Sequence, residues 1–286
     1  MYNPVLTFDI EEWFHPVLLG ASERGEQKPR AREVLLWLLD LLDERKVKAT
    51  FFVLGETLEL YPDLFGRIAS SGHELACHGF THKPLWHQTS ESFRAELRLF
   101  KDRFTTMLPG VVLRGFRAST FSLEQKTAWA ADVLESEGFL YDSSIFPYRN
   151  HVYGVPRAEL SPYRLSSNDV AQDAPGGRLL ELPMPVLNFG RIRIPFVGGF
   201  YSRVLPLKLQ VFLIRRTLKL RPVILYFHPW EFDPGVPRVP SGKLNEWITY
   251  TGIEKMRGRL EYLLQKFDFM TAWELVQVCE RSRPSC

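Results

Sequence analysis

Short apolar runs with strand character alternate along the chain with longer segments whose apolar residues recur at helical spacing. Strands are predicted at residues 5–10, 48–54, 73–77, 113–117, 139–142, 179–187, 192–197, 223–228 and 267–270. Helices are predicted at residues 32–45, 62–71, 91–108 and 205–220, and after capping boxes that start at Ser122, Thr251 and Thr271. Because strands that alternate with helices form parallel sheets with covered faces, the pattern predicts an α/β fold.

Length and composition narrow the classes of protein that this chain can belong to. Its 286 residues suffice for a large core, and its formal net charge of +3 does not favour nucleic acid as a partner. Three cysteines give no disulfide framework, and no apolar run reaches the length of a membrane span. No signal peptide is recognisable, so a cytoplasmic location is predicted. The sequence indicates nothing about oligomeric state.

No internal repeat and no clear linker divides the chain. Residues 1–286 are therefore predicted to form one domain. Within it, residues 145–222 are expected to form an inserted arm, which begins where regular patterns fade into loop chemistry, from residue 144 to about residue 178. Residues 223–286 would complete the barrel with further strands and helices.

Five polar clusters lie at or just past the carboxyl ends of predicted strands, at residues 9–12, 78–82, 114–117, 141–144 and 226–231. In parallel barrels this edge is where active sites are built. Polar residues scattered at random over the surface would not fall there five times. The placement predicts one active site assembled from all five clusters.

The first two clusters carry the residue types of an open catalytic metal site. Asp9 and Glu11 share one face of a strand, and paired carboxylates repel each other unless a cation or proton is shared. His78 and His82 are four residues apart, which allows both imidazoles to meet one ion in a turn. Strand alternation favours Glu11 as the third ligand, whereas a bulge would present Glu12 instead.

Three further residues are candidates for proton transfer and for positioning. Arg117 follows a strand and is placed to pair with Asp9, or to form an ion pair that only stabilises the fold. His228 ends the most apolar strand, where it would be a general acid or a core residue, with Asp142 as a candidate partner. Cys77 lies on the alternate face and is interpreted as core packing, not as a nucleophile.

These motifs resemble those of the polysaccharide deacetylases with a NodB homology domain, carbohydrate esterase family 4, over residues 5–276. The segments that carry the resemblance are LTFDIEEW (6–13), GHELACHGFTH (72–82), GFRAS (115–119), YDSS (141–144) and LYFHPWEFDP (225–234). The first motif resembles a branch that spaces its two acids one residue apart, and Ser119 stands where the third motif usually has proline. GGFYSRVLP (198–206) and YTGIEK (250–255) resemble deacetylases found beside bacterial exopolysaccharide loci.

The resemblance implies a distorted barrel of about seven strands and a role for each matched residue. Asp9 would be the general base, tethered by Arg117, and His228 the general acid. Glu11, His78 and His82 would bind a divalent metal, with zinc favoured over cobalt, nickel or manganese. A backbone N–H near Asp142 would help to stabilise the oxyanion.

The predicted activity is metal-dependent removal of an N-acetyl group from an amino sugar. A nucleotide-linked or lipid-linked saccharide suits the predicted compartment, and residues 190–222, with eight Lys or Arg and no acid, are a candidate for peripheral contact with the inner membrane face. A packed helix with a solvated basic edge is the alternative for this segment. The same metal site would also suit a deformylase or a cyclic-imide hydrolase. A catalytically inactive carbohydrate-binding protein is the alternative from another class.

Overall fold

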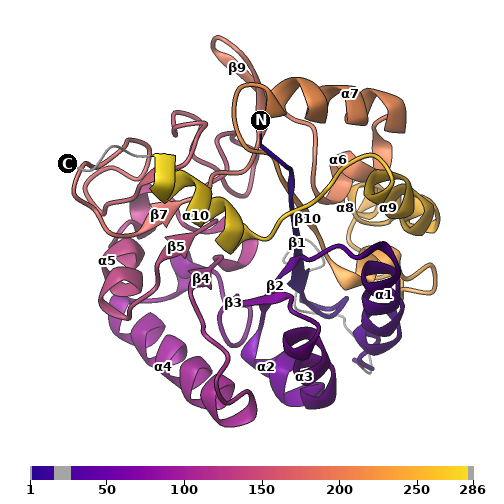
Figure 1. Cartoon of the computed structure of the whole chain (residues 1–286), viewed down its shortest axis with the longest axis horizontal. Coiled ribbons are helices and arrows are strands. Elements are labelled where there is room, and N and C mark those ends of the chain that lie inside the picture. The colour runs from indigo at the N-terminus through magenta and orange to yellow at the C-terminus, as the bar shows by residue number, and fades with distance from the viewer. Residues whose placement is uncertain (1, 16–26, 283–286) are drawn as a thin grey trace.

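A computed structural model describes residues 2–15 and 27–282 of the chain (Figure 1). One sheet has eight strands in the order β10-β1-β2-β3-β4-β5-β7-β6, all parallel except that β6 runs antiparallel to β7. A separate hairpin pairs β8 with β9. The strands are β1 (Val5–Ile10), β2 (Thr50–Val53), β3 (Glu74–Cys77), β4 (Gly115–Phe116), β5 (Tyr141–Asp142), β6 (Tyr163–Arg164), β7 (Leu180–Glu181), β8 (Val186–Phe189), β9 (Ile192–Pro195) and β10 (Ile224–Phe227).

Helices surround the outside of the curled sheet, so that it forms a half-barrel (Figure 1). The α-helices are α1 (Ala31–Arg45), α2 (Gly55–Leu60), α3 (Pro62–Ser70), α4 (Ser90–Met107), α5 (Trp129–Ser136), α6 (Gly199–Val204), α7 (Leu207–Leu218), α8 (Lys243–Tyr250), α9 (Met256–Leu264) and α10 (Ala272–Ser282). Single turns of 3-10 helix are η2 (Leu85–His87), η3 (Ser119–Phe121), η4 (Gln125–Thr127), η5 (Pro229–Phe232) and η6 (Ile253–Lys255).

The central strand β1 shows why this sequence forms a parallel sheet. All six of its residues are buried, as expected for a strand covered on both faces. Its register places Thr7 beside Tyr226 of β10 and beside Thr50 of β2. The Thr7 hydroxyl donates a hydrogen bond to the Leu225 carbonyl, which satisfies a polar side chain inside the sheet.

Helix α10 closes the end of the half-barrel at which β2 and β3 begin, and it lies in front of the strands in Figure 1. The Ala272 N–H donates to the Thr50 hydroxyl, and the Trp273 N–H donates to the buried Glu74 carboxylate. Leu275 and Val276 pack against the apolar residues of the sheet's inner face. The helix therefore shields the inner core from solvent while its first N–H groups find partners.

The predicted α/β class and the mostly parallel curled sheet are confirmed. Individual boundaries differ: β4, β5 and β7 are only two residues long, and the strand predicted at 267–270 is reduced to a single bridge between Val5 and Met270. The helix expected to begin after Ser122 starts at Trp129, because a 3-10 turn with its own capping box comes first. The capping box at Thr271 is confirmed by reciprocal hydrogen bonds with Glu274.

Candidate active site

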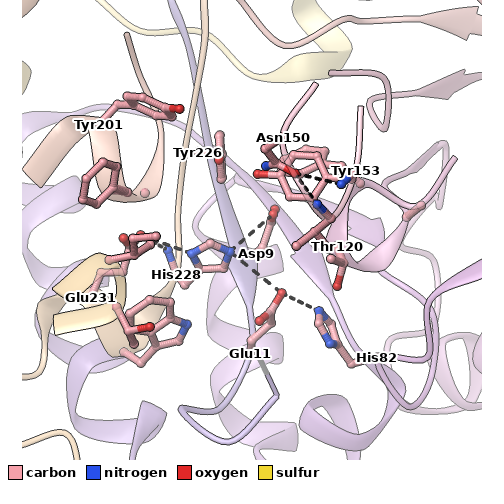
Figure 2. A pocket seen from close by; sticks show the side chains of 18 of the residues that line it. Asp9, Glu11, His82, Thr120, Asn150, Tyr153, Tyr201, Tyr226, His228 and Glu231 are labelled. Carbon is pink, nitrogen blue, oxygen red and sulfur yellow. Dashed lines mark hydrogen bonds and ion pairs between the residues drawn. The ribbon is translucent and has the colours of Figure 1, made fainter. Parts of the chain in front are cut away.

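A cavity of about 340 Å³ opens at the carboxyl ends of the strands. Asp9, Glu11, His78, His82 and His228 all line it, so the structure brings together residues that are up to 219 positions apart in the chain. Figure 2 shows His228 pointing toward Asp9 and Glu11, with His82 on the other side of Glu11. Both Arg117 and Asp142, the remaining predicted site residues, lie outside the cavity lining.

Glu11, His78 and His82 form the only cluster of three or more metal-ligating side chains found in residues 2–15 and 27–282. Glu11 Oε1 lies 3.0 Å from His78 Nε2 and 2.8 Å from His82 Nε2. All three side chains are buried. A carboxylate and two imidazoles that converge in this way match the ligand composition of catalytic zinc sites.

The hydrogen bonds of the two histidines and the lowered pKa of His82 fit a divalent ion. His78 Nδ1 lies 2.8 Å from the Arg117 carbonyl, so it donates there and leaves Nε2 with a free lone pair. His82 Nε2 is buried without a hydrogen-bond partner in the described structure, although Glu11 is close. Burial lowers the pKa of His82, which keeps the imidazole neutral as a metal ligand must be.

Glu12, the alternative ligand, is engaged elsewhere. Its carboxylate accepts hydrogen bonds from the N–H groups of Arg30 and Ala31 and from the Tyr61 hydroxyl. It therefore stabilises the first turn of α1, where free N–H groups and the helix dipole favour a negative charge. Of the two acids, only Glu11 is directed at the histidines.

Asp9 and Arg117 form a fully buried ion pair beneath the cavity. Arg117 Nη1 lies 2.6 Å from Asp9 Oδ1 and also donates to Thr7 Oγ1, 2.8 Å away. The guanidinium donates twice more to Ser143 and lies over the Phe52 ring, with 4.0 Å between the guanidinium carbon and the ring centroid. Because its donors are occupied on several sides, Arg117 fixes the orientation of the Asp9 carboxylate.

His228 is held by an acid from its own turn. Glu231 Oε2 lies 3.2 Å from His228 Nδ1 and also accepts the His228 backbone N–H at 3.0 Å. His228 Nε2 faces Asp9 Oδ2 at 4.0 Å and Glu11 Oε1 at 3.9 Å (Figure 2). Burial alone would lower the pKa of His228, but the charges of Glu11, Glu231 and Asp9 outweigh it and raise the pKa to about 9.

A second arginine stabilises this arrangement from the opposite side. Arg203 of α6 is buried, and its Nε lies 3.1 Å from Glu231 Oε1. Burial would raise the pKa of Glu231, but the hydrogen bond from His228 and the charge of Arg203 hold the pKa below its usual value. Glu231 is therefore an anion between two cations. The sequence signal for it was the His-Pro-Trp-Glu spacing, which is that of a capping box.

The predicted role of Asp142 as partner of His228 is wrong. Its carboxylate accepts hydrogen bonds from the Ser144 hydroxyl at 2.6 Å and from the Ser144 N–H at 3.2 Å. The neighbouring N–H groups of Ser143 and Ile145 donate to the Phe116 carbonyl and to Glu181, so neither is available for an oxyanion. Burial next to Asp142 raises the pKa of Glu181 well above its ordinary value, which keeps one proton on this pair.

Sequence reasoning did not identify most of the aromatic wall of the cavity. The wall consists of Phe121, Tyr148, Tyr153, Phe200, Tyr201, Tyr226 and Trp230. Tyr226 and Trp230 belong to the predicted cluster at residues 226–231, whereas the other five lie in short or irregular segments. Thr120 and Phe121 adopt left-handed backbone conformations with φ of 58° and 48°. Such conformations are uncommon for residues other than glycine and cluster at functional sites.

Cys77 is confirmed as a core residue. It is fully buried, and this burial raises the pKa of its thiol, which leaves it protonated and unreactive at neutral pH.

Two family models match this chain, one in each half. Residues 5–137 match the polysaccharide deacetylase family, and residues 143–277 match a domain of unknown function, DUF3473. The first match contains Asp9, Glu11, His78, His82 and Arg117. The second contains His228, Glu231 and Arg203, so the cavity is built from both matched regions.

Curated relatives resemble the first half of the chain. A chitooligosaccharide deacetylase from Rhizobium leguminosarum bv. trifolii is 37% identical over 97 residues, which are 34% of this chain and 42% of the relative. A peptidoglycan-N-acetylglucosamine deacetylase from Bacillus cereus is 31% identical over 96 residues, 33% of this chain and 34% of the relative. The matched segments thus span well under half the length of these relatives.

Solved structures share the fold along nearly the whole chain. A Mycobacterium smegmatis protein described as a polysaccharide deacetylase has a TM-score of 0.57 at 22% identity. The alignment covers 99% of this chain and 94% of the Mycobacterium chain. The allantoinase PuuE has a TM-score of 0.62 at 15% identity, over 99% and 91%. A carbohydrate esterase family 4 pseudoenzyme from Bacillus anthracis has a TM-score of 0.50 at 13% identity, over 96% and 65%. At these identities the likeness concerns the fold alone.

Proposed function

Because residues 5–137 match the polysaccharide deacetylase family, we propose that the chain is a metal-dependent hydrolase that removes an N-acetyl group from an amino sugar. The observation that supports this most is the content of one cavity. It holds three candidate metal ligands, a carboxylate fixed by a buried arginine, and a histidine oriented by a glutamate. These are the groups that hydrolysis of an amide requires.

Glu11, His78 and His82 would hold the ion, and zinc is the metal that best suits one carboxylate and two imidazoles. When bound, a divalent ion polarises the acyl carbonyl and brings the pKa of a bound water toward about 7. Cobalt, nickel and manganese can occupy similar donor sets, so elemental analysis of the purified protein would identify the native metal.

In the proposed mechanism, Asp9 and His228 divide the proton transfers. Asp9 Oδ1 is bound to Arg117, whereas Oδ2 faces the cavity and accepts the proton of the attacking water. His228 carries a proton on Nε2 and gives it to the departing sugar nitrogen, while Glu231 holds Nδ1. The carboxylates of Glu11, Glu231 and Asp9 raise the pKa of His228, which favours the protonated imidazole, and Glu231 retains this effect when Glu11 is bound to an ion.

We propose an N-acetylated saccharide as the substrate, carried by a nucleotide or a lipid. Relatives are named for chitooligosaccharide and for peptidoglycan N-acetylglucosamine, which are both N-acetylated amino sugars. A cavity of about 340 Å³ lies at the lower end of ligand-pocket sizes, so one or two sugar units fit it. Its aromatic wall suits the apolar faces of sugar rings. The cytoplasmic face of the inner membrane remains the proposed location, with no nucleic acid as partner.

Metal content and acetate release, measured together, test this proposal. Wild-type protein should contain about one divalent ion per chain and release acetate from N-acetylated sugars. The His78→Ala/His82→Ala variant should lose both, whereas His87→Ala, which removes an exposed histidine outside the cavity, should lose neither. N-formyl and cyclic-imide substrates assayed in parallel distinguish the alternative hydrolases. Sugar binding without metal and without turnover would point to the inactive carbohydrate-binding alternative and contradict the proposal.

A further inference from the structure

Exposed apolar side chains gather in one part of the molecule. Thirteen large hydrophobic side chains are exposed within the described residues, and nine of them lie between positions 189 and 247, about a fifth of the chain. Scattered exposed hydrophobics are ordinary, but a concentration of this kind marks an interaction site. Phe189, Ile192 and Phe212 are among the most exposed, at 64%, 61% and 57%.

The β8–β9 hairpin carries two of these side chains at its tip. Phe189 and Ile192 are the last cross-strand pair, and the turn between them consists of Gly190 and Arg191. Gly190 has φ of 70°, a conformation suited to a tight hairpin turn. The tip therefore presents two apolar side chains beside one arginine, all of them exposed. Figure 1 shows the hairpin projecting from the edge of the molecule.

Helix α7 presents a similar mixture on its outer face. Its inner face is buried through Val211, Ile214 and Leu218. A surface helix normally turns polar residues outward, but here Leu209 and Phe212 are exposed. They alternate with exposed basic residues, which are Lys208, Arg215, Arg216 and Lys219. A solvated basic edge alone would not account for Phe212.

The Lys and Arg residues between positions 182 and 230 have no Asp or Glu among them in the sequence. Residues 190–222 contain eight Lys or Arg. Three of the eight act within the fold: Arg203 faces Glu231, while Arg193 and Arg221 donate to backbone carbonyls. The other five are exposed on the hairpin tip and along α7.

The hairpin and the helix lie next to each other. Arg221, just after α7, donates a hydrogen bond to the Val186 carbonyl of β8. In Figure 1 both elements occupy the same edge of the molecule. We define the docking surface as the hairpin tip (Phe189, Arg191, Ile192) together with Lys208, Phe212 and Arg216 of α7 and Lys219, which follows α7.

We propose that the docking surface binds the headgroup region of an anionic lipid bilayer. Interfacial segments bind membranes by burying aromatic and aliphatic side chains at shallow depth while Lys and Arg meet anionic headgroups. Exposed apolar side chains among exposed basic residues, in a stretch of sequence that contains no Asp or Glu, have that composition. This inference does not depend on the proposed deacetylase activity, since it concerns residues outside the catalytic cavity.

Vesicle co-sedimentation of the full chain tests the proposal. Protein should sediment with vesicles of phosphatidylcholine containing phosphatidylglycerol at low salt, and much less with pure phosphatidylcholine. The Phe189→Ser/Ile192→Ser variant should lose most of this binding. Lys208→Ala/Arg216→Ala/Lys219→Ala should weaken it by up to about fivefold per charge removed, and high salt should have a similar effect.

Matched controls remove exposed residues of the same kinds elsewhere. Leu99→Ser/Leu140→Ser and Lys126→Ala/Arg157→Ala/Lys255→Ala should bind vesicles like the wild type. Thermal unfolding of each variant identifies any that is misfolded. Binding by the hairpin variant equal to that of the wild type would overturn the proposal, as would no binding to anionic vesicles at low salt. Concentration-dependent self-association that the hairpin variant abolishes, without vesicle binding, would assign this surface to a second copy of the chain instead.

Discussion

Glu231 Oε2 lies 3.2 Å from His228 Nδ1, and the two residues belong to the same short turn after β10. The spacing of three residues lets the acid contact both the imidazole and the His228 backbone N–H. Glu231 thus orients the proposed general acid His228 and favours its charge from only three residues further along the sequence. The other proposed proton carrier, Asp9, depends on Arg117, which is 108 positions away.

Replacing Glu231 by Gln should shift the pH dependence of the reaction. Loss of its charge and of its hydrogen bond lowers the pKa of His228, so the proton that His228 donates is lost at lower pH. The alkaline limb of the kcat/KM profile should move to lower pH, and kcat should fall by at least about tenfold. Bound metal would offset the charge of Glu11, which leaves Glu231 as the main source of the shift. An unchanged alkaline limb in a folded, metal-loaded variant would show that Glu231 does not act on His228.

Asp9→Asn should lower kcat by about 10²- to 10⁴-fold, because the amide cannot accept the proton of water. Metal content should remain near the wild-type value, since Asp9 is not one of the three clustered ligands. Single-turnover acetate release and elemental analysis of the same preparation measure both quantities. Activity within a few fold of wild type would remove Asp9 from its proposed role.

Glu11→Gln should affect metal binding, whereas Glu12→Gln should affect stability. Glu11→Gln removes a proposed ligand, so metal affinity should fall by more than the roughly 10- to 100-fold typical of residues that only orient ligands. Glu12→Gln should retain the metal but destabilise the protein by about 1–2 kcal/mol, because its carboxylate caps the start of α1. Competition titration with a chelating dye and urea unfolding distinguish the two. The reverse result would make Glu12 the ligand.

His73 should make the protein less stable in mild acid. Burial lowers the pKa of His73 to about 4, against 6.5 when unfolded. The unfolded chain therefore binds a proton first as the pH falls, and about 3 kcal/mol of stability present above pH 6.5 is lost on approach to pH 4. His73→Asn keeps an acceptor for the Ala49 N–H but cannot titrate. Urea unfolding from pH 7 to pH 4 should show a shallower decline in the variant, and parallel declines would refute the prediction.

Much of this site was predictable because its residues follow strands. Asp9, Glu11, His78 and His82 end or follow β1 and β3. Strand periodicity places Asp9 and Glu11 on one face, and the four-residue spacing lets the two histidines meet one ion. Strand alternation favoured Glu11 over Glu12, but it could not exclude Glu12, whose engagement depends on the first N–H groups of α1. Asp142 was misassigned for a similar reason: a strand-end position does not reveal that Ser144 and Glu181 occupy the carboxylate's surroundings.

The aromatic wall could not be predicted from periodicity. Tyr148, Tyr153 and Tyr201 lie in irregular or short segments, where neither the helical nor the strand repeat applies. Their convergence on one cavity results from tertiary packing of residues 145–204 against the sheet. Limited proteolysis tests the prediction that residues 1–286 form one domain, which should resist cleavage between the two matched regions.

Strand β1 has consequences for how the protein reaches its native state. It pairs on one side with β2 and on the other with β10, whose residues lie about 218 positions later. During synthesis, the strand that carries Asp9 keeps an open hydrogen-bonding edge until residue 227 has left the ribosome. Sheets completed by such distant contacts fold slowly, and their unpaired edges favour aggregation in the meantime. A fragment that ends at residue 137 would therefore be prone to aggregate, however complete its metal ligands are.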